Sequence, residues 1–387
     1  MRPVPSIMDM VEVMERLESK SLHMEPAHCV RVRNRNASCS RCVDACPTQA
    51  IALSGNSLSV DSQSCIGCGS CVTACPTSAI RAMKPSDAEL DASIDVSSRA
   101  LEGAAVAVCA RVSAKRAADA DAVAVVPCVS RLGVANLVGA CARGASSLTV
   151  VDGVCATCKY RKAAEGFSDR VHAANVLLEA WGSTARVAST SELPQRARAQ
   201  SAAQGTGGVS RRHFFSAARA SVKDVAAEAV AVTVENELGI RRDRASLRAM
   251  LRVDASGTMP HVRAYAHESL MESLFEMGDP ASGAVTDAGL WGDVVVDGTS
   301  CVMCGMCATF CPTGALRKVF AEGEKRPVLD RLEFRVADCV ACGLCEDACV
   351  RKALHVERAV DCEKILELEP RAIRGAKRMQ AGGLFKR

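Results

Sequence analysis

The stretch Cys65-Ile-Gly-Cys-Gly-Ser-Cys-Val-Thr-Ala-Cys-Pro76 places four cysteines at the spacing CxxCxxCxxxC, followed by proline. A search for internal repeats finds this spacing again near the C-terminal end. It recurs at Cys301, Cys304, Cys307 and Cys311, which Pro312 follows, and at Cys339, Cys342, Cys345 and Cys349, where Val350 replaces the proline. A further copy keeps Cys39, Cys42, Cys46 and Pro47, and its first position is displaced to Cys29. The four copies use sixteen of the 22 cysteines, so the repeat organises both ends of the chain.

This spacing suits an iron-sulfur cubane. Three thiolates from one tight loop can bind three irons, while the fourth cysteine, expected at the start of a helix, points to a second cluster. Zinc is the alternative, but zinc-binding CxxC pairs usually lie about 15 to 20 residues apart, whereas here the pairs overlap. For the displaced Cys29, the alternative is a structural cysteine that binds no cluster.

These motifs resemble those of bacterial-type ferredoxins that carry two [4Fe-4S] clusters. The resemblance implies small α+β ferredoxin-like modules at both ends of the chain, over residues 29–84 and 291–360. It also implies crossed ligation, in which the fourth cysteine of each motif binds the cluster of the other motif. The four ligand sets would then be Cys29, Cys39, Cys42 and Cys75; Cys65, Cys68, Cys71 and Cys46; Cys301, Cys304, Cys307 and Cys349; and Cys339, Cys342, Cys345 and Cys311.

Residues 100–190 have a different pattern, in which short Val-rich runs alternate with helical stretches. The expected strands are 104–109, 121–127, 148–151 and 186–188, and the expected helices are 131–143 and 162–181. Such alternation is typical of a parallel sheet with covering helices. The sequence therefore predicts a small α/β domain between the two modules.

Cysteines follow three of the expected strands. The loops at the carboxyl ends of parallel strands converge on one edge of the sheet, so these thiols are expected to gather there. The candidate site consists of Cys109, Cys128, Cys155 and Cys158. The alternatives are a [2Fe-2S] cluster, zinc, a redox disulfide between Cys155 and Cys158, or scattered core cysteines. Cys141 shares a helix face with apolar residues and is interpreted as a buried, inert thiol.

This middle segment also resembles the delta subunit of methyl-viologen-reducing hydrogenases. The resemblance rests on Val126-Pro-Cys-Val-Ser-Arg131, Ala140-Cys-Ala-Arg-Gly144 and Gly153-Val-Cys-Ala-Thr-Cys-Lys-Tyr160. It implies a [2Fe-2S] cluster that links a hydrogenase to a heterodisulfide-reductase flavoprotein. The chain departs from the family pattern at Ser130 and Lys159, and its two loop cysteines are closer together.

The remaining segments of the chain contain no candidate site and are expected to connect or flank the three domains. We expect an N-terminal helix over residues 1–28, a linker over 191–209, a helical connector over 210–290 and a basic tail over 361–387. The chain has 387 residues and a net charge of only +4, which does not favour nucleic acid as a partner. No apolar run reaches the length of a membrane span, and no secretion signal is evident, so a cytoplasmic location is expected.

Together these features predict an iron-sulfur protein with four [4Fe-4S] clusters and one further [2Fe-2S] or zinc site. The sequence contains no glycine-rich nucleotide loop and no recognisable nucleophile pattern, so no catalytic residue is assigned. Whether the chain is itself an enzyme stays open, and a non-catalytic electron-transfer component of an oxidoreductase is favoured. Its partner would be a redox protein or a catalytic subunit of a hydrogenase or heterodisulfide-reductase-like complex. The alternatives are a ferredoxin-type accessory or maturation factor and a redox sensor.

Overall fold

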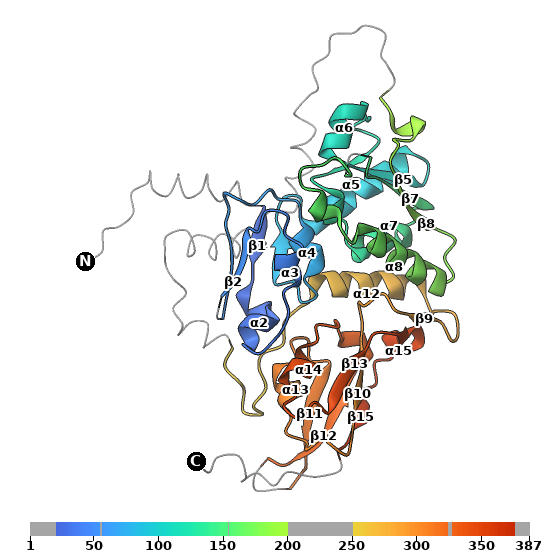
Figure 1. The fold of residues 1–387 in the computed structure, drawn as a ribbon. Helices are drawn as coiled ribbons and strands as arrows, with labels where there is room; N and C mark the ends of the chain where they lie inside the picture. Colours follow the sequence, from blue (N-terminus) through green and yellow to red (C-terminus); the bar gives the residue numbers. More distant parts are fainter. Residues whose placement is uncertain (1–20, 55, 154, 200–250, 324–326, 376–387) are drawn as a thin grey trace, which may run out of the picture.

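A computed structural model describes residues 21–54, 56–153, 155–199, 251–323 and 327–375 of the chain (Figure 1). Three regions follow one another along these residues: a cysteine-rich N-terminal domain, a middle α/β domain and a cysteine-rich C-terminal domain. Over the described part of the chain, every helix is too short or too polar to cross a membrane.

The N-terminal domain consists of short helices and two small antiparallel ribbons. Strand β1 pairs with β4, and β2 pairs with β3. The expected N-terminal helix does not extend through residues 22–28, because 22–24 form a strand along β4; residues 1–20 lie outside the described residues. The elements are β1 (Leu22–Met24), the 3-10 helix η1 (Pro26–His28), α2 (Val30–Arg33), α3 (Arg41–Asp44), β2 (Ile51–Ser54), β3 (Ser57–Val60), α4 (Ser70–Ala74) and β4 (Ile80–Ala82).

The middle domain contains the parallel sheet that the sequence predicts. Its four strands lie in the order β6-β5-β7-β8, and all neighbouring pairs are parallel. All six residues of β5 are buried, as expected for a central strand with both faces covered. The elements are α5 (Asp87–Ala100), β5 (Ala104–Cys109), α6 (Ala110–Arg116), β6 (Ala124–Val126), η2 (Val129–Arg131), α7 (Val134–Ala142), β7 (Ser147–Val151), η3 (Arg161–Ala164), α8 (Phe167–Ala180) and β8 (Arg186–Thr190).

The start of the expected linker packs against the middle domain. Leu193 and Ala197 are buried, and the backbone of Arg198 forms a bridge with Ala118. The 3-10 helix η4 (Gln195–Ala197) lies in this stretch. Burial of the two apolar side chains explains why residues 191–199 are ordered despite their polar composition, while 200–209 lie outside the described residues.

The described part of the expected connector contains one long helix, α12 (Tyr265–Met277). Leu270 and Leu274 on this helix are buried, and the helix packs along α7 of the middle domain. Figure 1 shows α12 running between the middle domain and the C-terminal domain. Residues 210–250 of the connector lie outside the described residues.

The C-terminal domain includes part of the expected tail. Residues 371–373 form strand β15, which pairs with β12, and Arg371 bonds to Asp293 at 2.7 Å. This pairing orders a basic segment that composition alone would assign to a tail. The elements are β9 (Val285–Thr286), β10 (Asp293–Val296), α13 (Met306–Phe310), β11 (Leu316–Phe320), β12 (Leu329–Phe334), η6 (Val336–Asp338), α14 (Leu344–Ala348), β13 (Leu354–Glu357), β14 (Val360–Asp361), α15 (Cys362–Leu366) and β15 (Arg371–Ile373).

Candidate iron-sulfur centres

The CxxCxxC loops share a backbone conformation that directs peptide groups inward. Gly69, Gly305 and Gly343 have positive φ values and begin the short helices α4, α13 and α14. Two positions earlier in each loop, Gly67, Met303 and Ala341 are also left-handed. Alternation of left-handed and right-handed residues forms concave nests of backbone N–H groups, which bind anions and iron-sulfur clusters.

The fourth cysteine of each motif follows the end of a short helix and does not begin one, contrary to the expectation from the sequence. Its sulfur accepts a hydrogen bond from a backbone amide a few residues later. The third residue after each of these cysteines has a positive φ, which turns the chain back toward the sulfur. N–H···S bonds of this kind stabilise thiolates and tune the clusters that they bind. The donor and acceptor pairs are Ala50 to Cys46 at 3.3 Å, Ala79 to Cys75 at 3.2 Å, Leu316 to Cys311 at 3.5 Å and Ala353 to Cys349 at 3.3 Å.

In the N-terminal domain, each group of thiols combines cysteines of one motif with the last cysteine of the other motif. Site 1 denotes Cys29, Cys39, Cys42 and Cys75; site 2 denotes Cys46, Cys65, Cys68 and Cys71. Burial raises the pKa of Cys42 to about 12, and the other three thiols of site 1 contribute by charge repulsion. Burial likewise raises the pKa of Cys71 well above its usual value, with the other thiols of site 2 adding to the effect. Ligation must therefore release protons and supply positive iron to offset this repulsion.

The C-terminal domain repeats the arrangement. Site 3 denotes Cys301, Cys304, Cys307 and Cys349; site 4 denotes Cys311, Cys339, Cys342 and Cys345. Burial raises the pKa of Cys307 to about 12, and the other site 3 thiols add to the effect. The pKa of Cys345 is raised well above its usual value, first by burial and then by the thiols of site 4. The grouping agrees with the crossed ligand sets, which stay a prediction.

Two small cavities test whether these residues fit a cluster. One is lined by all four cysteines of site 2, together with apolar side chains such as Leu22 and Ile51. The other is lined by all four cysteines of site 4, together with Val294 and Phe334. A cavity walled by thiols and apolar side chains suits a cluster, so the residues fit the cofactor that the motifs imply.

Single metal ions fit these groups poorly. Within the described ranges, no three cysteine, histidine, aspartate or glutamate side chains are arranged to share one ion. A cluster differs from a single ion, because each thiolate binds a different iron and the sulfurs stay further apart.

The middle cysteines follow three adjacent parallel strands. Cys109 ends β5, Cys128 follows β6, and Cys155 and Cys158 lie in the loop after β7. Burial raises the pKa of Cys155 to about 12, and the charges of Cys128, Asp152, Cys109 and Cys158 add to the effect. These four thiols, termed the middle site, are therefore neighbours. All 22 cysteines lie within the described residues and are free thiols, including Cys155 and Cys158.

If the middle site binds an iron-sulfur cluster, replacement of Cys128 by serine is expected to remove that iron and to leave sites 1 to 4 loaded. The matched control is Cys141→Ser, because Cys141 is buried in the core on α7 and burial alone is the main cause that raises its pKa, to about 11. Iron and sulfide analysis of both full-length variants measures the effect. Equal loss of iron from the two variants would contradict the proposed site. The full chain is needed because α12 covers α7.

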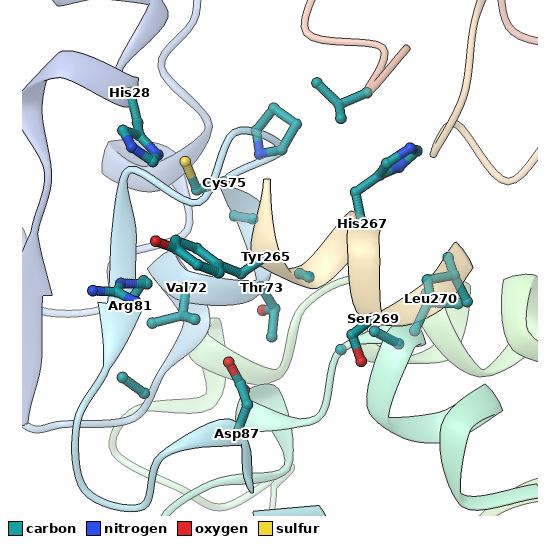
Figure 2. A pocket seen from close by; sticks show the side chains of 18 of the residues that line it. His28, Val72, Thr73, Cys75, Arg81, Asp87, Tyr265, His267, Ser269 and Leu270 are labelled. Carbon is teal, nitrogen blue, oxygen red and sulfur yellow. The ribbon is translucent and has the colours of Figure 1, made fainter. Parts of the chain in front are cut away.

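A cavity of about 1290 Å³ opens beside Cys75 of site 1. Residues of the N-terminal domain, the middle domain and α12 line it, and Figure 2 shows Cys75, Arg81, Tyr265 and His267 around it. The guanidinium of Arg81 lies 4.5 Å from the centre of the Tyr265 ring. Site 1 therefore faces this cavity through Cys75.

Glu25 lies beside one arginine and two histidine side chains at the wall of this cavity. Its carboxylate lies 2.8 Å from Arg81, 2.8 Å from His28 and 3.4 Å from His23. Burial alone would raise the pKa of Glu25. Hydrogen bonds from both histidines and the charges of His28 and Arg81 outweigh burial, and the pKa is held well below its usual value.

Glu25→Gln is expected to lower the free energy of unfolding by about 1 to 3 kcal/mol at pH 7. A lowered folded-state pKa stabilises the fold above the unfolded value of about 4.3 and loses this effect as the pH falls through the folded value. The difference between variant and wild type should therefore shrink below about pH 4. Urea denaturation at several pH values measures it, with the exposed Glu276→Gln as control. A pH-independent difference would contradict the assignment.

One cysteine was not assigned from the sequence. Cys362 begins α15, is fully buried, and packs in the core of the C-terminal domain with Ile365. Burial raises its pKa to about 11, and the charge of Asp361 adds to this effect. Its isolation from any CxxC pair is the sequence signal for a structural role.

Comparison with known families supports the assignment of ferredoxin-type domains near both ends of the chain. The family of the 4Fe-4S dicluster domain matches residues 37–79 and 293–353. The first match begins after Cys29, and the second includes all eight cysteines of sites 3 and 4. No curated protein and no solved structure matches the chain. The chain therefore contains ferredoxin-type 4Fe-4S dicluster domains near both ends.

Proposed function

We propose that this protein is an electron-carrying subunit of a larger redox complex, of the hydrogenase or heterodisulfide-reductase type. The main support is that cysteines from different motifs line a common cavity, as Cys46 does beside Cys65, Cys68 and Cys71. The dicluster domains support an iron-sulfur electron-transfer role. The middle site, on its own α/β domain, supplies a further centre that a ferredoxin alone lacks.

Four [4Fe-4S] clusters, when bound, would accept and release single electrons. The chain's own residues set how readily this happens. The N–H groups of Ala50, Ala79 and Ala353 donate to ligand sulfurs, and apolar side chains exclude water from sites 2 and 4. Hydrogen bonds to sulfur and burial tune the reduction potential of a cluster, so the individual sites are expected to differ in potential.

Exposure suggests where a partner could reach the clusters. Cys304 of site 3 is the exposed thiol among the 22 cysteines, whereas the ligands of site 4 are buried or half-buried. Lys318 lies near Cys304 and Cys307, and its ammonium donates to the carbonyl of Gly257 at 2.8 Å. A redox protein or catalytic subunit that docks over site 3 would thus approach a cluster most closely.

Anaerobic purification with iron and sulfide analysis tests the proposal. We expect about sixteen iron atoms in four cubanes, and additional iron if the middle site is occupied. A reductive titration followed by EPR should resolve signals with different midpoint potentials. Iron analysis that settles near eight, with two cubane signals, would contradict the four-cluster proposal. Substantial zinc in place of iron would contradict it as well.

A further inference from the structure

The two sites within each ferredoxin-type domain are direct neighbours. Helix α3 carries Cys42 of site 1 and packs against α4, which carries Cys71 of site 2. In the C-terminal domain, α13 carries Cys307 of site 3 and packs against α14, which carries Cys345 of site 4. Sites 1 and 2 therefore form one pair, and sites 3 and 4 form another.

The middle site adjoins site 2. The hydroxyl of Ser130, two residues after Cys128, donates to the backbone carbonyl of Cys68 at 3.0 Å. Thr73 donates in turn to the carbonyl of Ser130 at 3.0 Å. At Gly69 an added Cβ would lie 2.5 Å from the side chain of Arg131, so glycine permits this close approach. The segments that carry Cys68 and Cys128 are therefore held against each other.

Site 1 adjoins site 4 across a direct contact between the two ferredoxin-type domains. Val30, Ala37 and Leu344 form a buried apolar cluster against which Cys39 of site 1 and Cys342 of site 4 both pack. Figure 1 shows α2 close to α13 and α14, in agreement with this contact. The two cysteines are thus separated by packed side chains and not by solvent.

Polar bonds fix the same contact. Asp347 accepts from the backbone N–H of Ser38 at 2.7 Å and from its hydroxyl at 2.9 Å. The guanidinium of Arg41 donates to the carbonyl of Ala341 at 2.9 Å. Hydrogen bonds between residues about 300 positions apart in the sequence therefore hold site 1 next to site 4.

A buried cation lies at this junction. Arg33 belongs to α2 of the N-terminal domain but lies near Cys311 and Cys342 of site 4. Its side chain is 4% exposed, and its Nε and Nη2 atoms have no hydrogen-bond partner. Unpaired buried donors are costly, so they fit a site that carries negative charge when loaded.

We propose that the chain holds one unbranched series of redox centres in the order middle site, site 2, site 1, site 4, site 3. The two ferredoxin-type domains would exchange electrons directly through the contact of Ala37 with Leu344, and the middle site would form one end of the series. This order rests on the proposed electron-transfer function and deepens it. It excludes a role for the middle site as the bridge between the two ferredoxin-type domains.

Each step moves one electron, which oxidises one centre and reduces the next, with no bond made or broken. Electron tunnelling slows steeply with distance, so transfer follows the chain of neighbours. Electrons enter from a one-electron donor protein at one end and leave to an acceptor protein at the other. Dithionite supplies them in the test below.

The test uses the full-length, dithionite-reduced protein and measures the magnetic interaction between clusters by EPR relaxation. Cys342→Ala, which removes a ligand of site 4, should remove the interaction with site 4 from sites 1 and 3. It should leave site 1 coupled to site 2, and site 2 coupled to the middle site. Cys128→Ser should alter the relaxation of site 2 alone. A change at site 3 or site 4 in Cys128→Ser would overturn the order, as would an unchanged site 1 signal in Cys342→Ala.

A second variant disrupts the contact between the two ferredoxin-type domains and leaves every cluster ligand in place. Ala37 is 2% exposed, so Ala37→Glu should force a carboxylate into the apolar contact and abolish the site 1 to site 4 interaction. The matched control is Ala52→Glu, the same change at an exposed position of β2. Retention of the interaction in Ala37→Glu would overturn the proposal. If Ala37→Glu loses the iron of site 1, the EPR relaxation of Cys342→Ala tests the proposed order instead, because that variant keeps all ligands of site 1.

Iron analysis of the same samples separates the two claims. A wild-type protein without iron would overturn both the proposed function and the order. A fully loaded wild-type protein with a different interaction pattern would overturn the order alone.

Discussion

Cys75→Ala is expected to abolish the same EPR signal as Cys39→Ala, with a loss of about four iron atoms in each variant. The reason is that Cys75 lies four residues after Cys71 in sequence, yet its charge acts on Cys42 and Cys29 of the other motif. Cys46→Ala should correspondingly match Cys68→Ala, because Cys46 lines the cavity of site 2. EPR of the four reduced variants, with iron analysis, measures the effect.

The control for this series is Cys362→Ala. Cys362 is fully buried but belongs to none of the four sites, so this variant should keep all its iron. If Cys75→Ala instead abolishes the signal lost in Cys68→Ala, ligation follows each motif separately and the crossed assignment is wrong. Cys29→Ala adds a further check, since loss of the site 1 signal would exclude a purely structural role for this cysteine.

Removal of the clusters is expected to unfold the N-terminal domain and to leave the middle domain folded. Cys29, Cys42, Cys46 and Cys71 belong to the buried core of the N-terminal domain, beside few large apolar residues such as Ile51 and Ile80. Domains this small seldom bury enough apolar surface to be stable alone, so cluster binding must contribute folding free energy. The middle domain has a core of aliphatic side chains from β5, β7, α7 and α8.

Hydrogen exchange before and after treatment of the full chain with a chelator and an oxidant measures this difference. Amides of residues 29–83 should lose most of their protection, while amides of β5 and β7 keep theirs and act as the internal control. Unchanged protection over residues 29–83 would show that the domain folds without its clusters and would contradict the argument.

The middle sheet illustrates what a local pattern can predict. The sequence predicts strands at 104–109 and 148–151, and the structure has them at Ala104–Cys109 and Ser147–Val151. Buried Val-rich runs have a strong preference for central parallel strands. The sequence pattern does not indicate the short helix α6, because its Arg and Lys residues leave no apolar face of useful length. The ends of the domains were harder to predict. Arg371 belongs to a strand only because Asp293 and β12 lie beside it.

The sequence by itself determined the kind of site at both ends, because cluster ligation depends on cysteine spacing within single loops and therefore on local geometry. It also marked the middle cysteines, since each follows a predicted strand. Tertiary structure alone decided which sites are neighbours. The contact of Ala37 with Leu344, and the bond between Ser130 and Cys68, join segments that are far apart in the chain. Such contacts depend on how whole domains pack, and the spacing of cysteines within a loop carries no record of that packing.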